Sequence, residues 1–143
     1  MAMFMTPENN PFANTCVLVI DDEPAIIKMV EVVLRDMGIT SIFKAQNGIE
    51  ALDYFAGGVN VVDVVICDWL MPKMDGLEFL RRLRAMHLEI PFLMLTSRKA
   101  TDDIIAARDA GVSGYITKPF TSGQLREKVE KFVTMLLKEK ETK

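Results

Sequence analysis

The sequence predicts a doubly wound α/β fold, in which helices cover both faces of a parallel sheet. Two observations predict it. Short apolar runs alternate with segments of helical periodicity along the chain, and strict alternation of this kind forces right-handed crossovers between parallel strands. The chain also has the size and composition of one domain: 143 residues, 50% of them hydrophobic and 26% charged, which is enough to bury a core and unlike a disordered chain.

The strands are expected at the apolar runs. The first, third and fourth runs are almost uninterrupted in apolar residues, as parallel strands covered on both faces are, so they should form the middle of the sheet. The expected strands are Cys16 to Ile20, Ser41 to Ala45, Val61 to Cys67, Pro91 to Leu95 and Gly114 to Thr117.

Helices are expected between the strands, and cap residues predict where each begins or ends. The first has Pro24 in its first turn and is closed by Gly38. The fourth begins at Thr101, with Gly111 as its expected stop. The fifth begins at Thr121, which a glutamine follows at the spacing of a capping box. The second and third helices are expected over about Gly48 to Phe55 and Gly76 to Met86.

The chain reads as one domain preceded by a short tail. Pro7 and Pro11 interrupt residues 1–14, which are expected to form a flexible N-terminal tail, and residues 15–143 form the domain. Linkers, repeats and a second core are absent from the pattern, so we expect no attached output domain.

Composition excludes several classes of function. No apolar run approaches the roughly 18 to 20 residues that cross a bilayer, so the sequence predicts a cytoplasmic protein without membrane insertion. A net charge of -3 offers no broad cationic surface, which argues against direct nucleic-acid binding. Cys16 and Cys67 fall in separate strands and are interpreted as buried, inert thiols.

Three acidic residues follow two strands that would be neighbours in such a sheet. Asp21 and Asp22 end the first strand, and Asp68 ends the third. Ligands of open α/β sheets bind outside the carboxyl ends of the strands, so these carboxylates should share one crevice. They repel one another unless a cation intervenes, and an all-oxygen site suits Mg²⁺ or Mn²⁺.

Two further side chains reach the same edge. Thr96 follows the fourth strand and Lys118 the fifth, which adds a hydroxyl and an ammonium group to the acidic crevice. Both can contact phosphoryl oxygens. A carboxylate nucleophile forms an aspartyl-phosphate when a metal ion and a lysine neutralise the transferred charge, so this set predicts phosphoryl chemistry.

At these positions the chain resembles the response-regulator receiver domains of two-component signalling, and is similar to their stand-alone chemotaxis type. The resemblance covers roughly residues 15–138 and implies a flavodoxin-like sheet with strand order 2-1-3-4-5. Four motifs carry it: VLVIDD at 17–22, DWLMPKMDG at 68–76, LTSR at 95–98 and YITKPF at 115–120.

The resemblance implies roles around the phosphoryl group. Asp68 would be the phosphoacceptor and Asp22 a direct Mg²⁺ ligand, with Mn²⁺ as a substitute ion. Asp21 would be the companion acid, acting through water, and the backbone carbonyl of Leu70 would complete the protein ligands. Lys118 would pair with the phosphoryl group and precede a cis peptide bond to proline.

The resemblance also implies a switch and its partners. Thr96 would contact the phosphoryl group in the active state, and Tyr115 would be the switch aromatic. A histidine kinase or phosphotransfer protein would be the phosphoryl donor. A downstream effector protein would bind the face formed by the fourth helix, the fifth strand and the fifth helix. Such a protein is a signalling phosphoacceptor and not an enzyme with a separate substrate, since it catalyses only its own phosphorylation and slow dephosphorylation.

Other interpretations stay open for single residues. Asp21 or Asp22 could cap the first helix, although capping explains one acid and not three. Tyr115 could fill core while its hydroxyl finds water. Arg98 could approach the phosphoryl oxygens or extend into solvent. Leu70 has no side-chain group to orient a hydrolytic water, which predicts slow dephosphorylation.

Four polar side chains near the third helix are interpreted as surface residues. His87 would need a helical bundle to act in phosphotransfer, which this pattern lacks. A basic cluster on the same helix is expected to be a solvated face, with a recognition patch as the alternative. Its members are Arg81, Arg82 and Arg84.

Three rival functions fit parts of the pattern. A flavodoxin-like electron carrier would bind flavin phosphate after the first strand, where the acidic residues 21–23 would repel it. An aspartyl-nucleophile phosphatase resembles a D-x-D pattern, whereas Asp68 is followed by Trp69 and Leu70. A scaffold-only receiver would lack the acids that this chain has.

Overall fold

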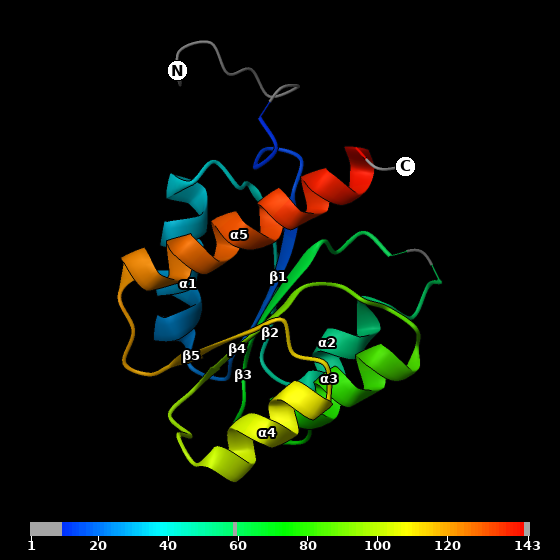
Figure 1. Cartoon of the computed structure of the whole chain (residues 1–143), viewed down its shortest axis with the longest axis vertical. Coiled ribbons are helices and arrows are strands. Elements are labelled where there is room, and N and C mark those ends of the chain that lie inside the picture. The colour runs from blue at the N-terminus through cyan, green and yellow to red at the C-terminus, as the bar shows by residue number, and fades with distance from the viewer. Residues whose placement is uncertain (1–9, 59, 142–143) are drawn as a thin grey trace.

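The computed structural model describes residues 10–58 and 60–141. Its strands form one parallel sheet with helices on both faces (Figure 1), in the order β2-β1-β3-β4-β5 that the family resemblance implies. The strands are β1 (Cys16–Ile20), β2 (Ser41–Ala45), β3 (Val64–Asp68), β4 (Phe92–Thr96) and β5 (Gly114–Thr117). The helices are α1 (Pro24–Asp36), α2 (Gly48–Asp53), α3 (Gly76–Ala85), α4 (Thr101–Asp109) and α5 (Ser122–Glu141). Within the described ranges, no helix is long and apolar enough to cross a membrane.

The sheet separates two apolar cores. Figure 1 shows α1 and α5 together on one side, and α2, α3 and α4 on the other. Alternate residues of the central strands supply the two sides: Leu18 and Ile20 of β1 pack in the core under α2 and α3, whereas Val17 and Val19 pack under α1 and α5. β1, β3 and β4 are buried along their whole length, which confirms that they occupy the middle.

β3 begins later than its apolar run predicts. The ladder with β1 starts at the pair Val17 and Val64, so the preceding apolar residues have no strand to pair with, and Val61 is 53% exposed. Asp63 closes this end of the pair: its amide donates to the carbonyl of Cys16, and its carboxylate accepts from the amide of Cys16, both at 2.8 Å.

Three of the described helices end in the same kind of cap, in which the second residue after the helix adopts a left-handed backbone. Glycine provides it after α1 and α4, at Gly38 (φ 100°) and Gly111 (φ 96°), as the sequence predicts. After α3 the position is occupied by His87 at φ 62°, whose amide donates to the carbonyl of Arg84. His87 is exposed, as expected, and it terminates a helix.

Arg84 differs from its expected place on a solvated face. Its guanidinium donates to three backbone carbonyls, those of Leu88 (2.6 Å), Ile90 (2.8 Å) and Gly111 (2.9 Å). The side chain therefore ties the end of α3 to the end of α4. Arg82 instead pairs with Glu78 on its own helix. Within the basic cluster, Arg84 therefore contacts backbone of other segments, whereas Arg82 contacts only α3 in this ion pair.

Residues 10–14, the described part of the segment expected as a tail, lie against the domain. From residue 10 to 14 the chain forms a turn, in which the amide of Phe12 bonds to the Asn10 side chain at 3.0 Å. Phe12 packs against the core under α1 and α5. The prediction of flexibility for residues 1–9 lies outside the described residues.

Candidate functional site

The carboxyl ends of β1 and β3 bring three aspartates together. β1 and β3 pair so that Ile20 is level with Cys67, which places Asp21 and Asp68 side by side just beyond that pair. Asp21, Asp22 and Asp68 each offer a carboxylate oxygen, and these oxygens lie within 4.8 Å of one another. The convergence predicted from the strand ends is therefore present.

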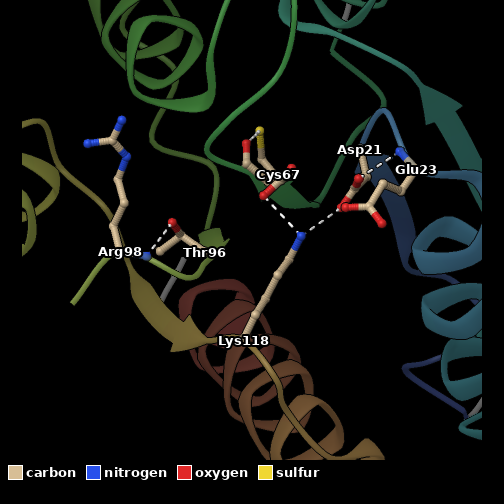
Figure 2. Close-up of polar contacts among 7 residues, drawn as sticks. Asp21, Glu23, Cys67, Thr96, Arg98 and Lys118 are labelled. Carbon is tan, nitrogen blue, oxygen red and sulfur yellow. Dashed lines mark hydrogen bonds and ion pairs between the residues drawn. The ribbon is translucent and has the colours of Figure 1, made fainter.

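Lys118 enters this acidic group from the end of β5. Its ammonium nitrogen is 3.1 Å from Oδ1 of Asp68 and 3.4 Å from Oδ2 of Asp21, as Figure 2 shows for the Asp21 contact. The backbone after β5 is held in place by a bond from the Lys118 amide to the carbonyl of Thr96 at 2.8 Å. The peptide bond between Lys118 and Pro119 is cis, as predicted.

Local backbone bonds fix the orientation of Asp21. Its Oδ1 accepts from the amide of Glu23 at 2.9 Å, and its own amide donates to the carbonyl of Ala45 at 3.1 Å. Asp21 is 1% exposed and Asp68 is 6% exposed, whereas Asp22 is exposed. Two carboxylates are thus buried, and the third faces outward, where an ion from solvent can reach it.

Burial and repulsion by neighbouring carboxylates raise the pKa values of Asp21 and Asp68. Burial raises the pKa of Asp21 to about 6, although the Glu23 amide opposes the rise, and the Asp68 carboxylate adds to it. Burial also raises the pKa of Asp68, against the opposing effect of Lys118. Burial alone would lower the pKa of Lys118, but the two carboxylates outweigh it and raise that pKa.

This donor set fits a divalent cation. Three carboxylates supply only oxygen ligands, which Mg²⁺ and Mn²⁺ prefer, and a single lysine does not cancel their charge. A metal ion would relieve the repulsion that raises the carboxyl pKa values. Leu70 follows Asp68 by two residues in the sequence and is 53% exposed.

Thr96 and Tyr115 lie beside the acidic group and are joined through one residue. β3 and β4 pair so that Asp68 is level with Leu95, which puts Thr96 one residue further along its strand. The Thr96 hydroxyl accepts from the amide of Arg98 at 3.0 Å, and the Tyr115 hydroxyl donates to the Arg98 carbonyl at 2.6 Å. Burial raises the pKa of Tyr115, while a bond to Thr96 opposes the rise.

An aromatic group that the sequence did not reveal lies next to Asp68. Trp69 is 3% exposed and packs edge-on to Tyr115, with ring centroids 6.4 Å apart. The guanidinium of Arg98 lies 5.2 Å from the Trp69 ring centroid. The sequence left the place of Arg98 open and assigned Trp69 no role, because no periodicity relates residues from three different loops and strands.

The family model for the response regulator receiver domain matches residues 17–130. The chain belongs to the response-regulator receiver family. It is 39% identical over 117 residues to the chemotaxis protein CheY of Pseudomonas aeruginosa, covering 80% of this chain and 93% of that protein.

Solved receiver structures agree with the fold. The receiver domain of Francisella response regulator 1452 superimposes with a TM-score of 0.78 at 31% identity, covering 86% of this chain and 99% of that one. The chemotaxis response regulator CheY4 of Vibrio cholerae does so with a TM-score of 0.74 at 31% identity, covering 82% and 98%. As a receiver, the chain belongs to a class of signalling phosphoacceptors that bind Mg²⁺ in an acidic pocket and act with kinases and effectors.

Proposed function

We propose that this receiver accepts a phosphoryl group on Asp68 from a histidine kinase or a phosphotransfer protein in an Mg²⁺-dependent reaction, and then changes its affinity for an effector protein. The observation that carries the proposal is the contact of Lys118 with Asp68, 3.1 Å long, inside a group of three carboxylates. A cap for α1 needs neither that lysine nor a carboxylate from a second strand.

The transfer step follows from these positions. An Asp68 carboxylate oxygen attacks phosphorus, an O–P bond forms, and the P–N bond to the donor imidazole breaks. The electron pair of that bond goes to the imidazole nitrogen, and the donor leaves as a neutral imidazole that carries a proton on its other ring nitrogen. Lys118 offsets the added negative charge on the phosphoryl oxygens.

A divalent ion would be held by Asp22, Asp68 and the Leu70 backbone carbonyl, with Asp21 as the companion acid. When bound, it supplies charge neutralisation and a template for the phosphoryl oxygens. Glu23 contributes through its amide, which keeps the Asp21 carboxylate turned into the group.

The response would run through a switch pair, Thr96 and Tyr115. A phosphoryl group on Asp68 offers a new acceptor for the Thr96 hydroxyl, which is 1% exposed. A ligand shifts a conformational equilibrium only by its differential contacts, so Thr96→Ala should accept the phosphoryl group and couple poorly to effectors. The proposed effector face comprises α4, β5 and α5, where α4 exposes Ile104 and Ile105. We place the protein in the cytoplasm with its kinase.

Acetyl phosphate with Mg²⁺ tests the acceptor directly. Intact-mass analysis of the wild type should detect one added phosphoryl group, labile to hydroxylamine, and none after chelation of the metal. Asp68→Asn should gain none, because an amide lacks the nucleophilic oxygen. Asp53→Asn on the exposed side of α2 is the matched control and should behave as the wild type. Equal labelling of Asp68→Asn would refute the assignment.

Donor identity requires a second experiment. Phosphotransfer from a panel of purified histidine kinases, followed by capture of proteins on the phosphorylated form, should identify one fast donor and the effector. If no kinase transfers faster than acetyl phosphate, a kinase is not the donor.

A further inference from the structure

Arg98 joins the switch pair through its backbone. Its amide donates to the Thr96 hydroxyl, and its carbonyl accepts from the Tyr115 hydroxyl. Both bonds fix the Arg98 backbone at the rim of the acidic group. The side chain that starts there is long enough to serve more than one neighbour.

The Arg98 side chain contacts α4 and Trp69. Nη1 of Arg98 lies 3.4 Å from Oδ1 of Asp103 in the first turn of α4, and the guanidinium covers the ring of Trp69, the residue after Asp68. Figure 2 shows the guanidinium turned away from Lys118 and Asp21. Arg98 therefore connects Trp69, the neighbour of Asp68 in the chain, to the first turn of α4.

This arrangement leaves the guanidinium incompletely satisfied. Nε of Arg98 is buried and has no hydrogen-bond partner among the described residues. The ion pair with Asp103 is long, and the two side chains are 38% and 28% exposed, so water and salt weaken it. A buried N–H group without an acceptor is disfavoured, and the present contacts hold Arg98 only loosely.

We propose that Arg98 is a second phosphoryl-binding residue beside Lys118, and that Asp103 competes with the phosphoryl group for it. The proposal rests on the proposed function, in which Asp68 becomes phosphorylated. A phosphoryl group adds about two negative charges and three acceptor oxygens. A guanidinium binds such a group with two parallel hydrogen bonds, which one partly exposed carboxylate cannot match. Arg98 then leaves Asp103, and the first turn of α4 loses its anchor.

Competition predicts that removing Arg98 and removing Asp103 change phosphoryl binding in opposite directions, which a purely structural role does not predict. Removing Arg98 should weaken phosphoryl binding. Removing Asp103 should strengthen it, because Arg98 no longer has to leave a partner. Without Arg98 the change at Asp103 should have no effect. If the pair merely stabilises the loop, both single changes act in the same direction.

The experiment is a titration of the Mg²⁺-saturated protein with beryllium fluoride, a mimic of the phosphoryl group, followed by ¹⁹F NMR of the bound species. Arg98→Gln should weaken binding about 10-fold, and Asp103→Asn should tighten it about 3-fold. The double variant should bind like Arg98→Gln. Asp102→Asn removes the same charge from the same exposed turn and should bind like the wild type.

The outcomes separate this inference from the proposed function. Wild-type binding that Asp68→Asn retains would refute the proposed function itself. Binding that requires Asp68, together with weaker or unchanged binding in Asp103→Asn, would refute only the competition. Circular dichroism of each variant checks that it is folded. Arg98→Lys keeps the charge but lacks the two parallel donors of the guanidinium, so its affinity for beryllium fluoride should lie between those of the wild type and Arg98→Gln.

Discussion

Mg²⁺ binding should weaken steeply below neutral pH, because Asp21 binds a proton where a free aspartate would not. Its pKa is about 6, so at pH 5 about ten molecules carry the protonated form for each that carries the carboxylate. If the metal requires the carboxylate, the apparent affinity at pH 5 should be about 10-fold below that at pH 7, or about 1.4 kcal/mol.

Protonation of Asp21 also stabilises the metal-free protein at low pH. Its folded pKa is raised from 3.8 to about 6, so the folded state binds the proton more tightly than the unfolded state does. The stabilisation from this proton is present below pH 3.8 and is lost as pH rises through about 6. Added Mg²⁺ should therefore raise the melting temperature more at pH 7 than at pH 5.

Isothermal titration calorimetry in buffers of different ionisation enthalpy measures both the affinity and the protons released on Mg²⁺ binding. Proton release should be near zero at pH 8, about half a proton at pH 6 and about 0.9 proton at pH 5. Asp21→Asn is the control, since it removes this titration and should flatten most of the pH dependence, leaving the part due to Asp68. A wild-type affinity that changes less than about 2-fold between pH 7 and pH 5 would show that Asp21 is not linked to the metal.

Three further predictions concern other residues. Arg84→Lys should lower the free energy of unfolding by about 2 kcal/mol in urea denaturation, because the donors of a compact ammonium start from one atom and cannot span three carbonyls as the planar guanidinium does. The exposed Arg81→Lys should change it by less than about 0.5 kcal/mol. His87→Gly should raise that free energy by about 0.5 kcal/mol by relieving the left-handed backbone, and His87→Ala should not, as thermal unfolding can show. Leu70→Asn should shorten the life of the phosphorylated form several-fold, because an amide can orient the attacking water; decay of labelled protein after donor removal measures it, and an unchanged rate would contradict the role of Leu70.

Strand periodicity and strand ends were sufficient to predict the sheet and its acidic edge. Asp21, Asp22 and Asp68 could be placed together because parallel strands end at one edge, and Lys118 reaches the same edge from β5. The same register separates the two thiols. Cys67 is level with Ile20, four residues beyond Cys16, so the two cysteines lie about 13 Å apart, beyond disulfide reach. Both are free and buried.

Sequence patterns failed where a side chain acts on distant backbone. Arg84 looks like one of three similar helix arginines, and only the approach of the chain after α4 gives it the carbonyl of Gly111. The apolar residues before Val64 look like strand, but pairing needs a partner, and the ladder with β1 begins only there. Both outcomes depend on tertiary neighbours that local propensity does not contain.

Two arginines outside α4, Arg84 and Arg98, hold its two ends by different kinds of contact. Ala107 is its one buried residue within the described helix, so packing does little to hold it. Arg84 fixes the C-terminal end through uncharged backbone, which a phosphoryl group does not affect. At the other end, Asp103 holds an arginine by a salt-sensitive pair. Any displacement of α4 should then be a rotation about its C-terminal end, largest at Thr101, and a protein bound across the first turn would detect a change that one bound near Asp109 would not.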